Sequence, residues 1–376
     1  MGKFLLFLSY VLELVASANA IEVQAPYVYL KDFDTGTVLL EKNADQKMVP
    51  SSMSKIMTVH LVLERLKNGD VKLDDTLHVS QEAWQKGGSK MFVQINSKVS
   101  IEDLLYGVAV QSGNDACIVF AEGLAGTEAA FAEEMTRKAH EMGATNSTFV
   151  NSSGWPDEGH LTTARDLAII AEKTIREFPE EYTKYYSLKE FTYNNIKQGN
   201  RNTLLYKNMG ADGMKTGHSD AGGYGIVASA KQGDRRLILV INGLPTSKDR
   251  DQEATALLNW GFNTFKNYKI FGKGDVVDVA DVWSGEEKKI ALVTGQDIIF
   301  TLPRSQRKDL SVKVIYDSPL TAPLKAGDQV GALEVTLPEK GVQKFPLYVA
   351  KNVKIAGFFE RISNSIHYLL WGKHSL

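Results

Sequence analysis

The segment Pro50-Ser51-Ser52-Met53-Ser54-Lys55-Ile56-Met57-Thr58 contains a nucleophile, a potential base and a helix start within nine residues. Residues i and i+3 of a helix share one face, with Cβ atoms roughly 5–6 Å apart. If Ser52 opens the helix, its hydroxyl and the Lys55 amine can therefore be within hydrogen-bond reach. Such a pair needs no histidine to activate the nucleophile. A surface helix start, with Ser51 or Ser52 as N-cap and Lys55 solvated, is the simpler explanation of this segment alone.

A β-hairpin is predicted before this segment and helices after it. Two apolar runs on either side of Asp34-Thr35-Gly36 indicate the hairpin. Apolar residues at helical spacing predict three helical regions: 52–68, 100–141 with interruptions, and 163–175. The polar, irregular stretch 151–163 predicts a long loop, and long loops inside compact domains are commonly functional.

The pattern changes to that of strands from Met214 onward. Three runs predict strands at 214–217, 225–230 and 236–241, followed by a closing helix over 254–265. Helices combined with antiparallel strands indicate a domain of the α+β class. We expect this domain to span residues 21–270.

Two smaller parts are predicted after this domain. Five of the ten prolines lie between Pro303 and Pro346, and neighbouring residues alternate as in half-buried strands. Residues 275–348 are therefore expected to form a small all-β domain. Residues 352–376 combine a bulky apolar stripe with a basic polar face, which suits an amphipathic helix lying in a membrane interface. A terminal helix docked on the protein's own core is the alternative.

The first twenty residues have the features of a secretory signal peptide. Lys3 is followed by a short apolar run and by a small-x-small ending at Ala20. A transmembrane anchor needs about 20 apolar residues, and this run is shorter. In the oxidising compartment that export implies, the single cysteine, Cys117, can form no internal disulfide and is expected to be buried and inert.

Charge and composition argue against two classes of partner. The formal net charge is −2, with no basic surplus that would suggest nucleic acid. The histidines form no His-x-His or His-x-x-x-His pair, and a structural zinc site would need more than one cysteine or such a pair. We therefore expect no metal site and no cofactor.

Two motifs further along the chain change the interpretation of Ser52 and Lys55. Ser112-Gly113-Asn114 lies in the second helical region, and Lys215-Thr216-Gly217 lies on the first strand predicted after it. Each tripeptide alone is weak, because ordinary turns and strand ends contain such residues. Together with Ser-x-x-Lys, and in this order, they form the motif set of penicillin-binding proteins and class A β-lactamases.

The chain resembles a known family beyond these motifs. The matching segments are 50–58, 111–117, 164–166, 200–202 and 212–218. They are similar to the low-molecular-mass penicillin-binding proteins of the penicillin-binding-protein-five type, the serine-type D-alanyl-D-alanine carboxypeptidases. The resemblance covers nearly the whole chain and implies a penicillin-binding, β-lactamase-like transpeptidase fold for the first domain. It also implies an exported, periplasmic protein attached peripherally to the outer face of the cytoplasmic membrane.

The family reaction removes the last D-alanine from peptidoglycan pentapeptides that end in D-Ala-D-Ala. The resemblance implies that Ser52 attacks the penultimate carbonyl, that Lys55 acts as base, and that Ser112 relays a proton to the leaving amine. An ordinary lysine is almost wholly charged at neutral pH. The pKa of Lys55 must therefore be lowered by burial or by a cation such as Lys215. β-Lactams are implied as covalent inhibitors.

The resemblance also implies how substrate is bound. Asn114 would contact the substrate amide and Lys55. The strand with Lys215, Thr216 and Gly217 would pair with the extended substrate, Gly217 permitting a close approach. The backbone N–H groups of Ser52 and His218 would form the oxyanion hole.

Three further residues match family positions. Arg201 and Arg250 correspond to arginines near the site, and arginine suits recognition of the terminal carboxylate; an ordinary surface salt bridge is the alternative for each. Asp166 follows the long loop and is expected either to help deacylation or to pair structurally with Arg165.

Two other functions stay open at this point. A class A β-lactamase needs a deacylating Glu in a Glu-x-x-x-Asn loop, and the one such spacing considered, Glu190 to Asn194, lies outside the 151–163 loop. We interpret it as a chance match. The non-enzyme alternative is a β-lactam-binding sensor or wall-shape scaffold whose acyl-enzyme persists.

Overall fold

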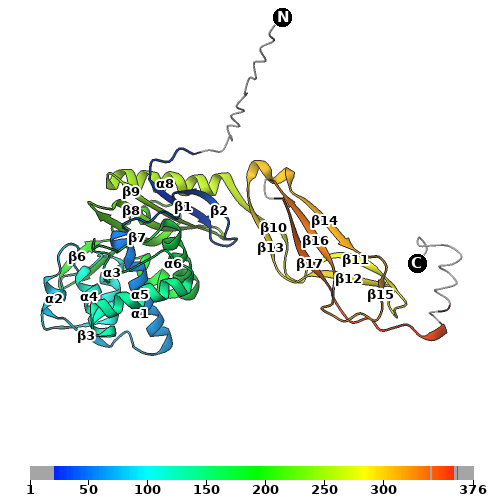
Figure 1. The fold of residues 1–376 in the computed structure, drawn as a ribbon, viewed down its shortest axis with the longest axis horizontal. Helices are drawn as coiled ribbons and strands as arrows, with labels where there is room; N and C mark the ends of the chain where they lie inside the picture. The colour runs from blue at the N-terminus through cyan, green and yellow to red at the C-terminus, as the bar shows by residue number, and fades with distance from the viewer. Residues whose placement is uncertain (1–20, 339–340, 360–361, 363–376) are drawn as a thin grey trace, which may run out of the picture. The chain divides into compact units, whose positions relative to one another are not determined.

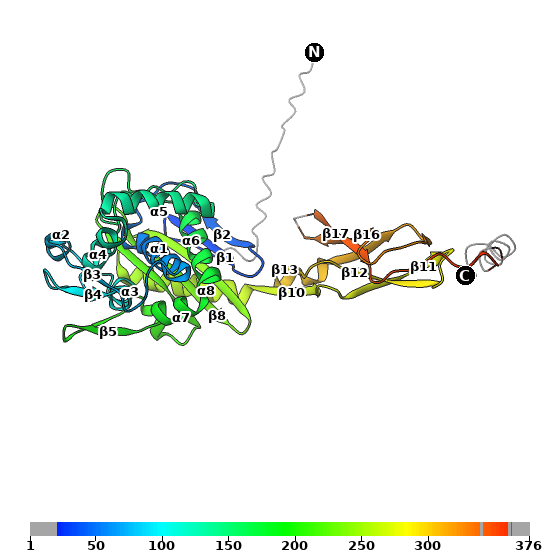
Figure 2. The same cartoon turned by 90° about the horizontal axis from the view of Figure 1, so that it is seen from below.

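The computed structural model describes residues 21–338, 341–359 and 362. The expected signal peptide, 1–20, and most of the expected C-terminal helix, 352–376, lie outside the described residues. The chain divides into two compact units (Figures 1 and 2). Unit 1 contains residues up to 30 together with 40–231 and 238–264. Unit 2 contains 31–39, 232–237 and the chain from Phe265 onward.

A five-stranded sheet of order β2-β1-β9-β8-β7 has most of its residues in unit 1, while the ends of β1, β2, β8 and β9 belong to unit 2 (Figure 1). Its strands are β1 Tyr27–Asp32, β2 Val38–Lys42, β7 Ala211–Ser219, β8 Gly223–Gln232 and β9 Arg235–Leu244. Two small antiparallel pairs accompany it: β3 Thr76–His78 with β4 Lys98–Ser100, and β5 Glu190–Tyr193 with β6 Ile196–Gly199. Because β7 is a terminal strand of the sheet, one of its edges pairs with no other strand in the described part of the chain.

Helices cover this sheet, with α8 on one side and the group containing α1, α3, α4 and α5 on the other (Figure 1). The helices are α1 Lys55–Asn68, α2 Gln81–Gln85, α3 Ile101–Ala109, α4 Asn114–Ala125, α5 Glu128–Met142, α6 Ala164–Glu177, α7 Pro179–Tyr186 and α8 Ser247–Thr264, with 3₁₀ turns η1 Ser51–Ser54 and η2 Thr203–Tyr206. The first turns of α1 and α4 are buried and carry polar side chains. These two helix starts therefore position the candidate site.

The α+β fold expected for this part of the chain is confirmed, and local signals set several helix ends. Ser100 Oγ accepts a hydrogen bond from the Asp103 N–H at the start of α3. Gly69 ends α1 in the left-handed region, with φ 80°. The first helix differs in one respect: α1 begins at Lys55, and Ser52 lies in the preceding 3₁₀ turn. The closing helix α8 begins at Ser247, earlier than the predicted 254.

Unit 2 is mainly β-structure, as expected for the second domain. A six-stranded sheet has the order β14-β16-β17-β12-β11-β15, and β10 pairs with β13. The elements are β10 Phe265–Phe271, β11 Val276–Trp283, β12 Lys289–Thr294, β13 Ile298–Pro303, η3 Arg304–Asp309, β14 Ser311–Tyr316, β15 Leu320–Thr321, β16 Gln329–Leu337 and β17 Gly341–Val349. Two apolar clusters, one around Leu292 and one around Leu333, form its core.

The last and longest segment of this unit begins at Phe265, with β10, whereas the sequence predicted that the second domain begins at 275. The strand β10 follows α8 directly, without a proline or glycine between them. The expected limits, 270 and 275, fall at and just after the end of this strand, where the alternating pattern of the second domain becomes recognisable.

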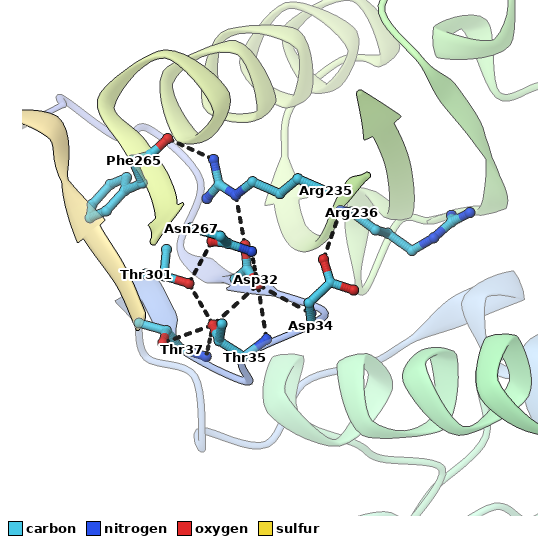
Figure 3. A network of polar contacts seen from close by, with 9 residues as sticks. All are labelled: Asp32, Asp34, Thr35, Thr37, Arg235, Arg236, Phe265, Asn267 and Thr301. Atoms are coloured by element: carbon cyan, nitrogen blue, oxygen red, sulfur yellow. Dashed lines mark hydrogen bonds and ion pairs between the residues drawn. The ribbon is translucent and has the colours of Figure 1, made fainter. Parts of the chain in front are cut away.

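A buried carboxylate joins the β1–β2 turn of unit 2 to strands β9 and β10 (Figure 3). Asp32, with a fully buried side chain, forms an ion pair with Arg235 Nε at 2.7 Å. The carboxylate also accepts hydrogen bonds from the backbone N–H groups of the β1–β2 turn, from a threonine hydroxyl and from an asparagine amide: Asp34, Thr35 and Asn267. We refer to Asp32 and these partners as the Asp32 cluster.

Candidate active site

The 3₁₀ turn η1 and the first turn of α1 bring Ser52 and Lys55 together. Lys55 Nζ lies 2.9 Å from Ser52 Oγ, the contact that the i, i+3 spacing predicts. Ser52 is half-buried and lines a cleft, whereas Lys55 is fully buried. The hydroxyl is therefore accessible from the cleft while the amine approaches it from the interior.

Lys55 is held in place by neutral oxygen atoms. Besides Ser52 Oγ, its Nζ contacts Asn114 Oδ1 at 2.7 Å and the Ser153 carbonyl oxygen at 2.6 Å. An ammonium group has three donors, and these three acceptors carry no charge. Burial without a contacting carboxylate lowers the pKa of Lys55 to about 8. The geometry thus presents an amine that is readily deprotonated beside a serine hydroxyl.

The start of α4 supplies the second motif. Asn114 is the first residue of α4, and its Nδ2 donates to the Gly87 carbonyl at 2.9 Å, so its Oδ1 is aimed at Lys55. Ser112 has φ 60°, and its Oγ is buried without a hydrogen-bond partner among the described residues. Buried polar groups are usually paired. An unpaired hydroxyl lining the cleft is available to a bound molecule.

Lys215, Thr216 and Gly217 lie on the terminal strand β7. Lys215 is buried, and its Nζ donates to the Thr216 carbonyl at 3.1 Å. Burial, and next to it the charge of Lys55, lowers the pKa of Lys215 well below its usual value. Burial is likewise the leading cause for Lys55, so a cationic Lys215 is not what chiefly lowers the Lys55 pKa.

Gly217 has a packing role that the sequence did not indicate. A Cβ at this position would meet the Pro50 carbonyl oxygen at 2.8 Å and Met53 Cγ at 3.0 Å. The strand β7 therefore approaches η1 closely, and this packing alone requires glycine. The neighbouring His218 is exposed and stacks on Tyr224, with ring centroids 3.8 Å apart.

Two hollows meet at Ser52. The first, of about 610 Å³, contains Ser112, Thr216 and both candidate arginines among its lining residues. The second, of about 430 Å³, is lined by Asn114, Trp155 and Pro156 among others. Ser52, Gly88, Ser89 and His218 line both. The arrangement offers a cationic hollow on one side of the serine and an aromatic one on the other.

The two arginines differ in how far their charge is already neutralised. Arg250 lies on α8 and contacts Asp251 Oδ1 through Nε at 2.9 Å and through Nη2 at 2.7 Å. Arg201 Nη1 instead donates to the neutral hydroxyl of Ser89. Both line the hollow of about 610 Å³. Arg201 is therefore the better placed of the two to bind an anion.

Asp166 lies among structural contacts, away from the cleft. Its carboxylate accepts hydrogen bonds from the Asn146 N–H and from Ser147 Oγ, each at 2.8 Å. It lines neither hollow at Ser52. Arg165 pairs with Asp45 and Glu41, so the alternative Arg165–Asp166 pair is also not what the structure shows. This placement argues against the expected role of Asp166 in deacylation.

Several contributors to the site were missed in the sequence. The Ser153 carbonyl belongs to the long loop, and backbone atoms leave no signal in a motif. Asp115 holds the segment that lines the cleft by accepting from the N–H groups of Met91, Phe92 and Val93. An acidic residue in the first turn of α4 was the only sequence signal for it.

Three other expectations concern groups outside the reaction. Cys117 is buried, and burial raises the pKa of its thiol to about 12, which agrees with an inert thiol. Within the described residues, no group of three His, Cys, Asp or Glu side chains is arranged to hold a metal ion. Also within that part of the chain, no helix has the length and apolar character needed to cross a membrane.

Comparison with known proteins identifies the family of the chain. A model of the D-alanyl-D-alanine carboxypeptidase family matches residues 14–246. The chain belongs to this family. Residues 265–355 match a model of the C-terminal domain of penicillin-binding protein 5. The family, the enzyme class and the fold that the sequence predicted are thereby confirmed.

Of three relatives, two cover about nine tenths of this chain and one covers about two thirds. D-alanyl-D-alanine carboxypeptidase DacC of Escherichia coli K12 is 41% identical over 353 residues, which cover 90% of this chain and 88% of that protein. The structure of penicillin-binding protein 5 from Haemophilus influenzae is 36% identical, with a TM-score of 0.78, and covers 89% of this chain and 99% of its own. Penicillin-binding protein D2 from Listeria monocytogenes, solved in a cefotaxime-bound form, is 30% identical with a TM-score of 0.60, covering 65% and 99%.

Proposed function

We propose that this carboxypeptidase releases the terminal D-alanine of peptidoglycan stem peptides through an acyl-enzyme on Ser52. The observation that carries the proposal is the 2.9 Å contact between Ser52 Oγ and the buried Lys55 Nζ, at the point where two hollows meet. A pKa of about 8 leaves an appreciable neutral fraction of Lys55 at neutral pH. Neutral Lys55 takes the Ser52 proton as Oγ attacks the penultimate carbonyl.

The other residues have roles on either side of the bond that breaks. Ser112 Oγ, which has no hydrogen-bond partner within the described chain, gives its proton to the leaving nitrogen and regains one from the Lys55 ammonium, which returns Lys55 to its neutral form. A water molecule later hydrolyses the Ser52 ester and restores the serine hydroxyl. The N–H groups of Ser52 and His218 stabilise the oxyanion, a single such donor contributing on the order of 3 kcal/mol. The open edge of β7, at Thr216 and Gly217, binds the extended peptide. β-Lactams acylate the same serine.

Arg201, with Arg250 beside it, binds the carboxylate of the departing D-alanine. Its guanidinium lies in the same hollow as Ser112 and Thr216 and has a neutral partner in Ser89. The Arg201→Ala change is expected to lower kcat/KM for a peptide ending in a free carboxylate by about 10–100-fold, the loss of a charge-assisted contact. A peptide amide serves as control, because it lacks the carboxylate and should be affected little.

The β-lactamase alternative finds little support in the structure. Glu190, the candidate deacylating residue, lies on β5 and pairs with Lys197 at 2.7 Å. It lines neither hollow at Ser52. The family match favours the carboxypeptidase over both the lactamase and the sensor.

One experiment separates the three functions. The purified protein is incubated with a peptide ending in D-Ala-D-Ala and, separately, with penicillin, while D-alanine release and the mass of the adduct are followed. The proposal expects D-alanine release and a penicillin adduct, both lost in Ser52→Ala. A stable adduct without D-alanine release would indicate the sensor, and rapid penicillin turnover the lactamase. An adduct that persists in Ser52→Ala would rule out the proposed site.

We also propose that the protein is exported and attaches peripherally to the outer face of the cytoplasmic membrane. The composition of residues 1–20 and the amphipathic pattern of 352–376 support this, as do the exposed side chains of Phe358, Phe359 and Ile362. Co-sedimentation with anionic lipid vesicles tests the attachment. Binding should be lost when the chain ends at Lys351, and unchanged binding would contradict the proposal. Cleavage after Ala20, read from the mass of the exported protein, tests the signal.

A further inference from the structure

A buried histidine outside the three motifs contacts the turn that carries Ser52. His160 lies near the end of the 151–163 loop and is 1% exposed. Its Nε2 is 2.8 Å from Ser54 Oγ, and its Nδ1 is 3.2 Å from the Val150 backbone nitrogen. Ser54 is fully buried in η1, two residues after Ser52.

The hydrogen-bond partners determine the tautomer of this imidazole. The Val150 N–H is a donor, so Nδ1 must accept and carries no proton. In the neutral ring Nε2 is then the protonated nitrogen and donates to Ser54 Oγ. The Ser54 hydroxyl has a single proton, which it donates to the Ser51 carbonyl at 3.0 Å. The contacts thus form a directed chain: Val150 N–H to His160, His160 to Ser54, and Ser54 to the Ser51 carbonyl.

The end of this chain lies on a strained piece of backbone. Ser51 has φ 49°, a left-handed conformation that residues with a side chain adopt at some energetic cost. A strained residue persists only where its surroundings hold it. The Ser51 carbonyl also packs against Gly154, where a Cβ would come within 1.9 Å of its oxygen. The carbonyl of Ser51 is therefore held from two sides, by Ser54 and by the loop that contains His160.

The same loop contacts the base. The Ser153 carbonyl accepts from Lys55 Nζ at 2.6 Å, and the side chain of Asn151 holds this part of the loop by accepting from the Gly154 N–H at 2.8 Å. His160 thus connects a loop that positions Lys55 to the turn that positions Ser52. A displacement at either end would lengthen the 2.9 Å contact between the two reacting groups.

We propose that His160 is a positioning residue for acylation, which acts through Ser54 to fix η1 with Ser52 Oγ against Lys55 Nζ. The proposal rests on the assignment of Ser52 and Lys55 under the proposed function. Burial lowers the pKa of His160 to about 4, which agrees with a neutral imidazole at pH 7. His160 lines neither hollow at Ser52, so it takes no part in contact with substrate.

The test compares two substitutions of His160 that divide its two hydrogen bonds. In His160→Gln the amide nitrogen occupies the place of Nε2 and keeps the donor to Ser54. In His160→Asn the amide oxygen occupies the place of Nδ1 and keeps only the acceptor for Val150. The rate of penicillin acylation of the full chain is measured by mass. The acylation rate of His160→Asn should be about 10–100-fold below that of wild type, the usual effect of a misplaced reacting group. The acylation rate of His160→Gln should stay near that of wild type.

A double-mutant cycle identifies the route of the effect. If His160 acts through Ser54, then Ser54→Ala should lower acylation as His160→Asn does, and the double variant should be no slower than Ser54→Ala. The proposal would be overturned if the acylation rate fell equally in the Gln and Asn variants, or if it stayed near wild type in both. It would also be overturned if the two losses of rate multiplied in the double variant. If the Asn variant does not fold, ¹⁵N spectra of the wild-type imidazole decide. An Nδ1–H tautomer or an imidazolium at pH 7 would also overturn it.

These outcomes are distinct from a failure of the proposed site. If a penicillin adduct still forms in Ser52→Ala, Ser52 is not the nucleophile, and both proposals are contradicted. If the adduct is lost in Ser52→Ala, the acyl-enzyme on Ser52 is supported. If the losses of acylation rate in the double-mutant cycle then multiply, only the role of His160 is contradicted.

Discussion

Two buried polar clusters in this protein are built on opposite principles. In the Asp32 cluster of unit 2, a fully buried carboxylate faces the Arg235 guanidinium and accepts from several backbone and side-chain donors (Figure 3). In the cluster around Lys55 in unit 1, a fully buried amine faces three uncharged acceptors. Nearby, the hydroxyl of Ser112 has no partner within the described chain.

The difference shows how structural and chemical roles are separated. A buried charge that is paired and fully hydrogen-bonded is stable in its ionised form, and removing one partner is costly. A buried amine with neutral acceptors loses much of its preference for the charged form, so its pKa falls into the working range. Burial beside uncharged acceptors, without a contacting carboxylate among the described residues, is thus what keeps the Lys55 amine easy to deprotonate. The following predictions test this contrast, beginning with the largest expected effect.

Removal of the Lys55 amine should abolish acylation with little effect on stability. Lys55→Met keeps most of the side-chain volume, so penicillin acylation should fall by about 10⁴-fold through loss of the base. The free energy of unfolding should stay within about 1 kcal/mol of wild type, because relief of the buried charge offsets the loss of its acceptors. Acylation rates and urea denaturation measure the two quantities. A fall of about 3 kcal/mol in the free energy of unfolding, as expected for removal of the Asp32 carboxylate, would contradict the proposed difference between the two clusters.

Removal of the unpaired hydroxyl should likewise affect the reaction alone. Ser112→Ala should lower D-alanine release by about 10²–10³-fold, since the leaving nitrogen loses its proton donor. Among the described residues the Ser112 hydroxyl makes no hydrogen bond that the substitution could remove, so the free energy of unfolding should be unchanged or slightly higher. Steady-state kinetics and thermal unfolding are the measurements. Ser153→Ala provides a control, because the Ser153 carbonyl that contacts Lys55 is retained.

Removal of the Asp32 carboxylate should lower stability and leave the reaction unchanged. Asp32→Ala leaves the largely buried Arg235 without its ionic partner, so the free energy of unfolding should fall by about 3 kcal/mol. Acylation measured well below the unfolding temperature should be unchanged. Asp45→Ala is the matched control: it removes a carboxylate from an exposed pair with Arg165 and should cost less than about 1 kcal/mol. Equal losses in the two variants would indicate that burial is not the decisive difference.

The smallest effect expected is a graded dependence on pH. Lys55 acts as base only when neutral, and its pKa of about 8 lies below that of an ordinary lysine. The acylation rate should therefore rise about tenfold per pH unit below pH 8 and level off above it. Rates with penicillin from pH 6 to pH 9.5 measure this profile. A rate that is flat across this range, or that falls as the pH rises through 8, would contradict the assignment of Lys55.

Much of the site could be predicted because its chemistry depends on side chains in recognisable order. The Ser52–Lys55 contact follows from helical spacing, although Ser52 lies in a 3₁₀ turn ahead of the helix. Asn114 was expected to contact Lys55, and its Oδ1 lies 2.7 Å from Nζ. In contrast, Asp166 was chosen for its position after the long loop and lies instead among contacts to Asn146 and Ser147.

The contributions that were missed come from backbone atoms and from buried non-motif residues. Neither the Ser153 carbonyl nor the imidazole of His160 belongs to a motif, and both depend on how the 151–163 loop folds back on η1. Gly217 was expected to make room for substrate, yet the structure gives it a closer neighbour in Pro50. Such contacts join residues that are far apart in the chain, and no local pattern encodes them.

The sequence by itself determined the family, the α+β class, the second β-rich unit and the three motifs, because periodicity and motif order are properties of the chain alone. Only the tertiary structure decided the state of the reacting groups. The pKa of Lys55 depends on burial, and burial depends on the packing of α1, α4 and the 151–163 loop around it. The same packing leaves the Ser112 hydroxyl without a partner among the described residues and sets Ser52 Oγ against Lys55 Nζ. A lysine in a motif becomes a base only in the low-dielectric environment that the folded chain provides.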